Sequence, residues 1–119
     1  MAGELDLSRL LQSLMPRVYP QRYAFDATVD STLREGQFAL IREDGGLTSI
    51  HPDNDGQWAR ISLEIHSSLE AVGLTGVISS RLAEKGISAN IVAARLHDHL
   101  FVPWDRRELA LLRGLESGA

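Results

Sequence analysis

The chain has 119 residues, with 44% hydrophobic and 24% charged side chains, as expected for one compact domain or two half-size units sharing a core. Cysteine is absent, which excludes disulfides, thiolate metal sites and cysteine nucleophiles. The net charge of -4, without a basic run, argues against nucleic-acid binding. No basic signal-peptide region opens the chain, and no apolar run approaches the roughly 18 residues of a membrane span. We therefore expect a cytoplasmic protein that binds neither nucleic acid nor a membrane.

The first half, residues 1–54, is predicted to contain one helix followed by three strands. Leucines at spacings of three and four predict the helix, and alternating β-branched and aromatic residues predict strands. The expected ranges are 7–15 for the helix and 23–29, 37–42 and 47–51 for the strands. Pro20 is interpreted as part of a connector. The segment 52–56, Pro-Asp-Asn-Asp-Gly, has the densest turn chemistry in the chain, so the internal boundary is placed there.

The second half, residues 55–119, begins with an alternating strand. Ile61 and Leu63 point to one face of this strand, and Ser62 and Glu64 point to the other. The period then becomes helical, with an apolar stripe formed by Leu74, Val77, Ile78 and Leu82.

Gly86 is expected to end this helix in the left-handed conformation. Strands are predicted over residues 87–94 and 99–102. Asp105, with Glu108 three residues later, predicts a capping box for a last helix.

These elements predict an α+β fold, with an αβββ half preceding a βαββα half. A βαββα unit forms an antiparallel sheet with both helices on one face, and a fourth strand would complete the ferredoxin-like pattern. No such strand follows the last predicted helix. A strand from the first half, or from a second subunit, is expected to occupy the open edge, and a homo-oligomer is predicted on this ground.

Residues 73–88, GLTGVISSRLAEKGIS, resemble an ACT domain, a regulatory module that binds small molecules. Gly73, Leu82, Gly86 and Ile87 occupy the places of the family pattern. The following segment, ISANIVAARLHDHLFVP, resembles the tandem-ACT group that contains small bacterial proteins and the cytosolic arginine sensor CASTOR. The resemblance is specific over residues 58–115. The first half resembles a reduced ACT-like unit without the helix between its strands.

The resemblance implies a small ligand, commonly an amino acid, bound where the loop after one strand faces a strand of a neighbouring ACT unit. The implied ligand-binding residues are Ser67, Ser68, Val72, Gly73, Leu74, Thr75, Asn90, Ile91, Val92 and Asp98.

The same residues suit a zwitterion on physical grounds. Backbone amides at the start of the helix near Gly73 attract a carboxylate, and Asp98 attracts an ammonium or guanidinium group. Two structural alternatives remain open. Residues 67–70, Ser-Ser-Leu-Glu, also form a capping-box pattern, and an Asp in a tight turn, as expected for Asp98, is common for local reasons.

Two other classes of function are weighed. His66, His97 and His99 allow a small metal-dependent enzyme, although their spacing matches no strong metal motif. A purely structural dimerisation module is the second alternative. No nucleophile-elbow or phosphate-loop motif is present. We therefore predict a regulatory or sensor module without catalysis and without a cofactor.

Overall fold

The computed structural model describes residues 15–64, 74–107 and 110. The elements are strands β1 (Arg17–Thr28), β2 (Ala39–Glu43), β3 (Gly46–Pro52) and β4 (Trp58–Glu64), helix α2 (Leu74–Glu84), strands β5 (Asn90–Ala93) and β6 (His97–Pro103), and the short 3-10 helix η2 (Trp104–Arg106). Within these ranges, no helix is both long and apolar enough to cross a membrane.

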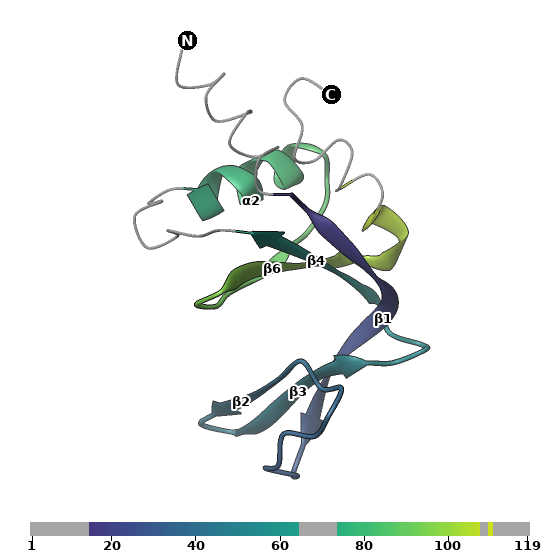
Figure 1. The fold of residues 1–119 in the computed structure, drawn as a ribbon, viewed down its shortest axis with the longest axis vertical. Helices are drawn as coiled ribbons and strands as arrows, with labels where there is room; N and C mark the ends of the chain where they lie inside the picture. The colour runs from purple at the N-terminus through teal and green to yellow at the C-terminus, as the bar shows by residue number, and fades with distance from the viewer. Residues whose placement is uncertain (1–14, 65–73, 108–109, 111–119) are drawn as a thin grey trace.

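All six strands form one antiparallel sheet in the order β2-β3-β1-β4-β6-β5 (Figure 1). The edge that the second half was predicted to leave open is filled by β1, a strand of the first half. This placement confirms the first of the two expected occupants. It also removes the open edge beside β4 as a reason for association with a second subunit.

The strand β1 is longer than predicted, because it begins at Arg17 and runs through Pro20. Its first part pairs with β4, from Arg17 opposite Ser62 to Tyr23 opposite Trp58, and its second part pairs with β3. The register with β4 shifts between Val18 and Arg22. An irregularity of this kind accommodates a proline, which cannot donate to the ladder. The interpretation of Pro20 as a connector was therefore wrong.

The two faces of the sheet are buried against different partners. The alternation predicted for β4 places Ile61 and Leu63 in a core with Ile78 and Leu82 of α2. The opposite face carries a second, aromatic cluster around Tyr23, Ile50 and Phe101, with Phe25, Phe38 and Trp58 packed against it. In Figure 1, α2 lies above β4 and β6, while β2 and β3 lie below them. The strongly bent sheet thus encloses the aromatic cluster.

The helix α2 begins at Leu74 and is followed by the turn predicted at Gly86. The amide of Gly86 donates to Ala83 O over 2.9 Å, and the amide of Ile87 donates to Leu82 O over 2.9 Å. Gly86 has a φ of 73°, the left-handed value that this helix ending requires. Ile87 is buried in the same core as Leu82.

Other predicted boundaries require correction. The strand expected over residues 87–94 is shortened to β5, and the strand expected over 99–102 is lengthened to β6. The turn between them is closed by the Ala94 amide, which donates to His97 O. After Pro103 the chain forms η2, which contains Asp105 and has no side-chain cap. Glu108, the partner of Asp105 in the predicted capping box, lies outside the described residues. Helix 7–15 lies outside the described residues, except for Met15.

Candidate functional site

Much of the predicted ligand site lies outside the described residues. Four of the predicted ligand-binding residues lie in the segment 65–73, which is not described: Ser67, Ser68, Val72 and Gly73. The alternative capping box over residues 67–70 lies in the same segment. Leu74 and Thr75 are the first two residues of α2. The predicted helix start is therefore confirmed at Leu74.

The predicted residues on β5 belong to a strand at the edge of the sheet. Asn90 is exposed, whereas Ile91 and Val92 are half-buried. Ile91 packs against the core shared with α2, and Val92 packs against the aromatic cluster. β2 is the other edge strand of the described sheet. Edge strands can pair with another chain, so β5 is one of two places where a neighbouring unit can meet this sheet.

Asp98 lies inside β6 rather than in the expected turn. It stands opposite Leu63 of β4 and Ala93 of β5, with only 5% of its surface exposed. Burial raises the pKa of Asp98 above its usual value of 3.8. Within the described residues its carboxylate forms no ion pair. A buried carboxylate of this kind is costly unless a cation or hydrogen-bond donor accompanies it.

The position of Asp98 in the register also places it near the predicted loop. Glu64, the last residue of β4, is opposite His97, so β4 leaves the sheet one residue beyond Asp98. Asp98 therefore lies at the end of the sheet where the segment 65–73 begins.

The alternative metal site is described only in part, because His66 lies outside the described residues. His97 and His99 share one face of β6, with ring centroids 6.1 Å apart. Burial, together with the charges of Arg60 and His97, lowers the pKa of His99 to about 4. Neither histidine belongs to a cluster of three metal-ligating side chains within the described ranges.

A cluster with metal-like donor spacing occurs instead in the first half. Ligand atoms of Asp26, His51 and Asp53 lie within 4.8 Å of one another. His51 Nε2 is 2.8 Å from Asp26 Oδ2, and His51 Nδ1 is 3.1 Å from Pro52 O. Burial lowers the pKa of His51, but these hydrogen bonds and the two carboxylate charges outweigh burial and raise it. A protonated His51 satisfies both contacts without a metal.

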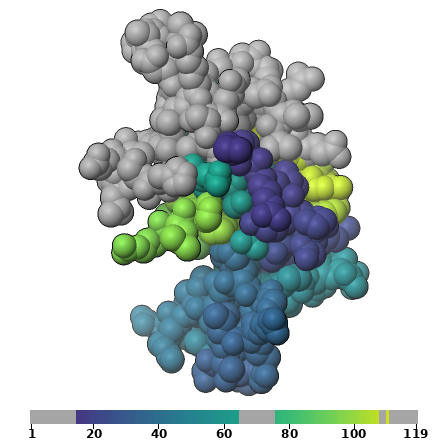
Figure 2. Space-filling model, in the orientation of Figure 1, coloured from purple at the N-terminus to yellow at the C-terminus, as the bar shows by residue number. Residues whose placement is uncertain are grey.

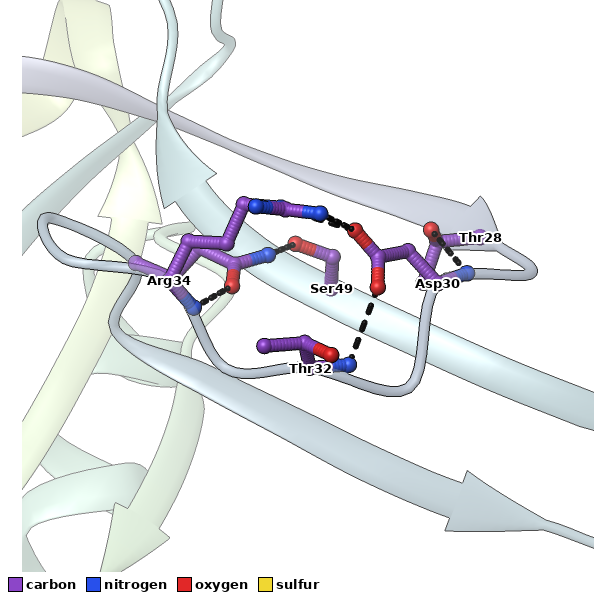
Figure 3. A network of polar contacts seen from close by, with 6 residues as sticks. Thr28, Asp30, Thr32, Arg34 and Ser49 are labelled. Carbon is purple, nitrogen blue, oxygen red and sulfur yellow. Dashed lines mark hydrogen bonds and ion pairs between the residues drawn. The ribbon is translucent and has the colours of Figure 1, made fainter.

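Beside this cluster, an open cleft of about 530 Å³ lies between β1, β3 and the segment 30–38. A polar network shapes that segment (Figure 3). Asp30 pairs with the Arg34 guanidinium at 2.7 Å and accepts the Thr32 amide at 3.0 Å. The Gln37 side chain accepts the Arg34 amide and donates to Ser49 Oγ over 2.8 Å. These bonds hold the segment against β3.

Comparison with known families identifies the fold. The family described as "ACT domain" matches residues 2–68, just over half of the chain. The chain belongs to the ACT domain family. This match covers the first half and β4, whereas the resemblance found in the sequence was placed mainly over residues 58–115. The family likeness of the first half is therefore stronger than the sequence motifs indicated.

Several solved structures have a similar fold. A protein of unknown function from Vibrio cholerae, described as a possible transport protein, is 34% identical over 98% of both chains, with a TM-score of 0.76. A protein from Agrobacterium tumefaciens is 19% identical over 75% of both chains, with a TM-score of 0.60. The ligand-free regulatory subunit of aspartate kinase from Thermus thermophilus is 9% identical, covers 84% of this chain and 92% of its own, and has a TM-score of 0.62. No curated protein matches.

ACT domains are generally regulatory modules that bind small molecules, and this ACT protein has the corresponding α+β architecture. Sequence patterns missed the residues that gather on the sheet face opposite α2, among them Tyr19, Phe38 and Arg60. Arg60 belongs to the polar side of the alternating strand β4, which suggested an exposed face. Only the pairing of β1 with β4 reveals that this face is covered.

Proposed function

We propose that this ACT protein is a sensor or regulatory module that binds an amino acid and has no catalytic activity of its own. The ligand's cationic group binds Asp98, and its carboxylate is held by backbone amides near Gly73 at the start of α2. The family assignment supports a small-molecule ligand, because that is the general role of ACT domains.

The observation that carries the proposal is the environment of Asp98. Only 5% of the surface of Asp98 is exposed, burial raises the pKa of its carboxyl group, and within the described residues it has no cationic partner. An ammonium or guanidinium group from a ligand would relieve the cost of this burial through a charge-assisted hydrogen bond. The strand that contains Asn90, Ile91 and Val92 is an edge strand of the described sheet and pairs with β6, which contains Asp98, so we expect a second subunit that pairs with this strand to lie beside the site.

We also propose that the protein works as a homo-oligomer joined through β5. ACT domains often oligomerise, and β5 is an edge strand in the described part of the sheet. β1 already occupies the edge beside β4, so β5 replaces that edge as the predicted contact with a second subunit.

A thermal-shift screen of the full chain against the twenty amino acids tests the proposed function. A ligand present at about 100 times its Kd stabilises the folded protein by about 2.7 kcal/mol. Calorimetry with the selected amino acid then measures the role of Asp98. A charge-assisted hydrogen bond contributes about 1.5–3 kcal/mol, so Asp98→Asn is expected to weaken binding about 10- to 150-fold.

Asp44→Asn is the matched control, because Asp44 lies in the exposed turn between β2 and β3. It is expected to bind the selected amino acid as tightly as the wild type. No stabilisation by any amino acid would favour a purely structural module. Stabilisation that Asp98→Asn retains in full would place the ligand elsewhere.

A further inference from the structure

The guanidinium group of Arg60 lies in a cage of aromatic rings on the sheet face opposite α2. Its central carbon is 3.9 Å from the ring centroid of Tyr19, 4.6 Å from that of Phe38 and 5.7 Å from that of Tyr23. The rings come from β1 and from the residue that precedes β2, whereas Arg60 belongs to β4. The cage therefore forms only where the two halves of the chain meet.

Within the described residues, no carboxylate neutralises Arg60. The ion pairs found there join Arg34 to Asp30 and His51 to Asp26. Arg60 Nη1 donates to Tyr23 Oη over 3.1 Å, but the buried Nε has no partner. A buried guanidinium N–H without an acceptor is unfavourable, because its interaction with water has been lost and not replaced.

His99 adds a second unpartnered polar atom to the same place. Only 8% of the surface of His99 is exposed, and the buried Nδ1 atom of its ring has no hydrogen-bond partner. The His99 ring is 4.8 Å from that of Phe38, so one phenyl ring contacts both His99 and Arg60. Ser62, opposite His99 in the register, lies 3.4 Å from the Tyr19 hydroxyl. A second guanidinium group, that of Arg17, also lies over the Tyr19 ring, with its central carbon 4.7 Å from the ring centroid. The cage thus combines Arg60 with several neutral polar groups, and Arg17 lies next to it.

We propose that this cage binds the carboxylate of a small organic anion, with Arg60 as its charged contact and His99 as a neutral hydrogen-bond partner. Aromatic contacts use the faces of a guanidinium group, and a carboxylate binds along its edge, so the two interactions are compatible. The aromatic walls suit an anion with a flat apolar body, because phosphate has no apolar surface to pack against these rings.

The proposed anion site is separate from the one assigned to Asp98. Successive residues of a strand point to opposite faces of a sheet, so His99 faces the cage and Asp98 faces the side covered by α2. Figure 2 shows a notch between the β5–β6 hairpin and the part formed by β2 and β3. Arg60 is half-buried, so part of its side chain is open to solvent.

Titration of the full chain with benzoate, followed by NMR of the Arg60 and His99 side chains, tests this site. Benzoate is expected to shift both signals with a Kd in the millimolar range, whereas the neutral isostere benzamide leaves them unchanged. Arg60→Met retains the apolar stem and is expected to weaken benzoate binding at least tenfold. Arg42→Met changes an exposed arginine of β2 and is expected to bind as the wild type does.

Equal shifts with benzoate and benzamide, or unchanged benzoate affinity in Arg60→Met, would overturn the proposal. Tighter binding of phosphate than of benzoate would also overturn the proposal. If Arg60→Met does not fold, Arg60→Lys replaces it, because lysine retains the charge but lacks the planar edge of the guanidinium group. Arg60→Lys is expected to weaken benzoate binding. An unchanged benzoate affinity in this variant would also contradict the proposal. These results are independent of the amino-acid screen, because neither variant alters Asp98.

Discussion

The backbone carbonyl of Tyr23 lies directly against Gly56. A Cβ atom on Gly56 would come within 2.3 Å of Tyr23 O, and within 2.8 Å of Tyr23 N. Gly56 is buried just before β4, where the chain crosses β1, and its own carbonyl accepts a hydrogen bond of 2.7 Å from Arg22 Nε. Only a glycine permits this approach of two backbone segments.

Gly56→Ala is therefore expected to destabilise the fold. The added methyl group meets backbone, which cannot move aside as a side chain can, so a loss of about 1–3 kcal/mol or more is expected. Thermal unfolding monitored by circular dichroism measures this change. Gly45→Ala is the control, since a Cβ there meets nothing within 4 Å, and equal melting temperatures for the two variants would contradict the argument.

Asp98→Asn is expected to stabilise the ligand-free protein at neutral pH. Burial raises the pKa of Asp98, so the folded state binds its proton more tightly than the unfolded state does. The ionised carboxylate then lowers stability above the folded-state pKa, and this penalty disappears below the unfolded value of 3.8. Denaturant unfolding at several pH values should show a difference between variant and wild type that shrinks towards acid pH. A variant that is less stable at neutral pH would show that the carboxylate has a structural partner.

His99 is expected to make the protein sensitive to acid. Burial and nearby positive charge lower its pKa to about 4, whereas the unfolded chain takes up the proton near 6.5. The unfolded state is thus favoured as pH falls from 6.5 to 4, by about 2–3 kcal/mol at 1.36 kcal/mol per pKa unit. His99→Gln should remove this contribution, so its stability relative to the wild type rises across that range. A constant difference between the two proteins would contradict the prediction.

The Asp30 network is expected to order its segment without contributing much to global stability. Its ion pair with Arg34 is largely exposed, and pairs of this kind contribute little. The Thr32 amide and Arg34 lower the pKa of Asp30, since both favour the charged carboxylate. Asp30→Asn should speed hydrogen exchange of the Thr32 amide while the melting temperature stays within about 2 °C of the wild type. Unchanged exchange would mean that other contacts hold the segment.

Light scattering at micromolar concentration is expected to show an oligomer that depends on β5. A lysine at an edge strand opposes pairing with another chain, so Asn90→Lys should shift the protein towards the monomer. Ala83→Lys adds the same charge on the exposed side of α2 and should leave the assembly intact. A monomeric wild type, or an equal effect of both lysines, would argue against β5 as the interface.

Local patterns predicted the elements that depend on local chemistry. The alternation around Ile61 and Leu63, the helix that starts at Leu74 and the left-handed turn at Gly86 are all confirmed. Each depends on a side-chain period or a backbone preference that neighbours in sequence determine. The ACT family likeness was also recognised, although it was placed mainly over residues 58–115, whereas the family model matches residues 2–68.

Features that depend on distant pairing were predicted poorly. Pro20 indicated a break, but a register shift against β4 accommodates it within β1. The turn before β6 was placed too late, so Asp98 was assigned to a turn although it is buried within a strand. The cage around Arg60 joins β1, β4 and Phe38, and no periodicity along the chain contains that information.

The position of β1 between β3 and β4 has a consequence for synthesis of the chain. β1 can pair with β3 as soon as residues 46–52 have left the ribosome, but its first part must wait for residues 58–64. Until then, Arg17 to Tyr23 form an unpaired edge next to an already formed hairpin. Such edges are open to pairing with other chains. Pro20, which cannot donate a backbone hydrogen bond, lies in this edge, and a proline at an edge opposes pairing with other chains.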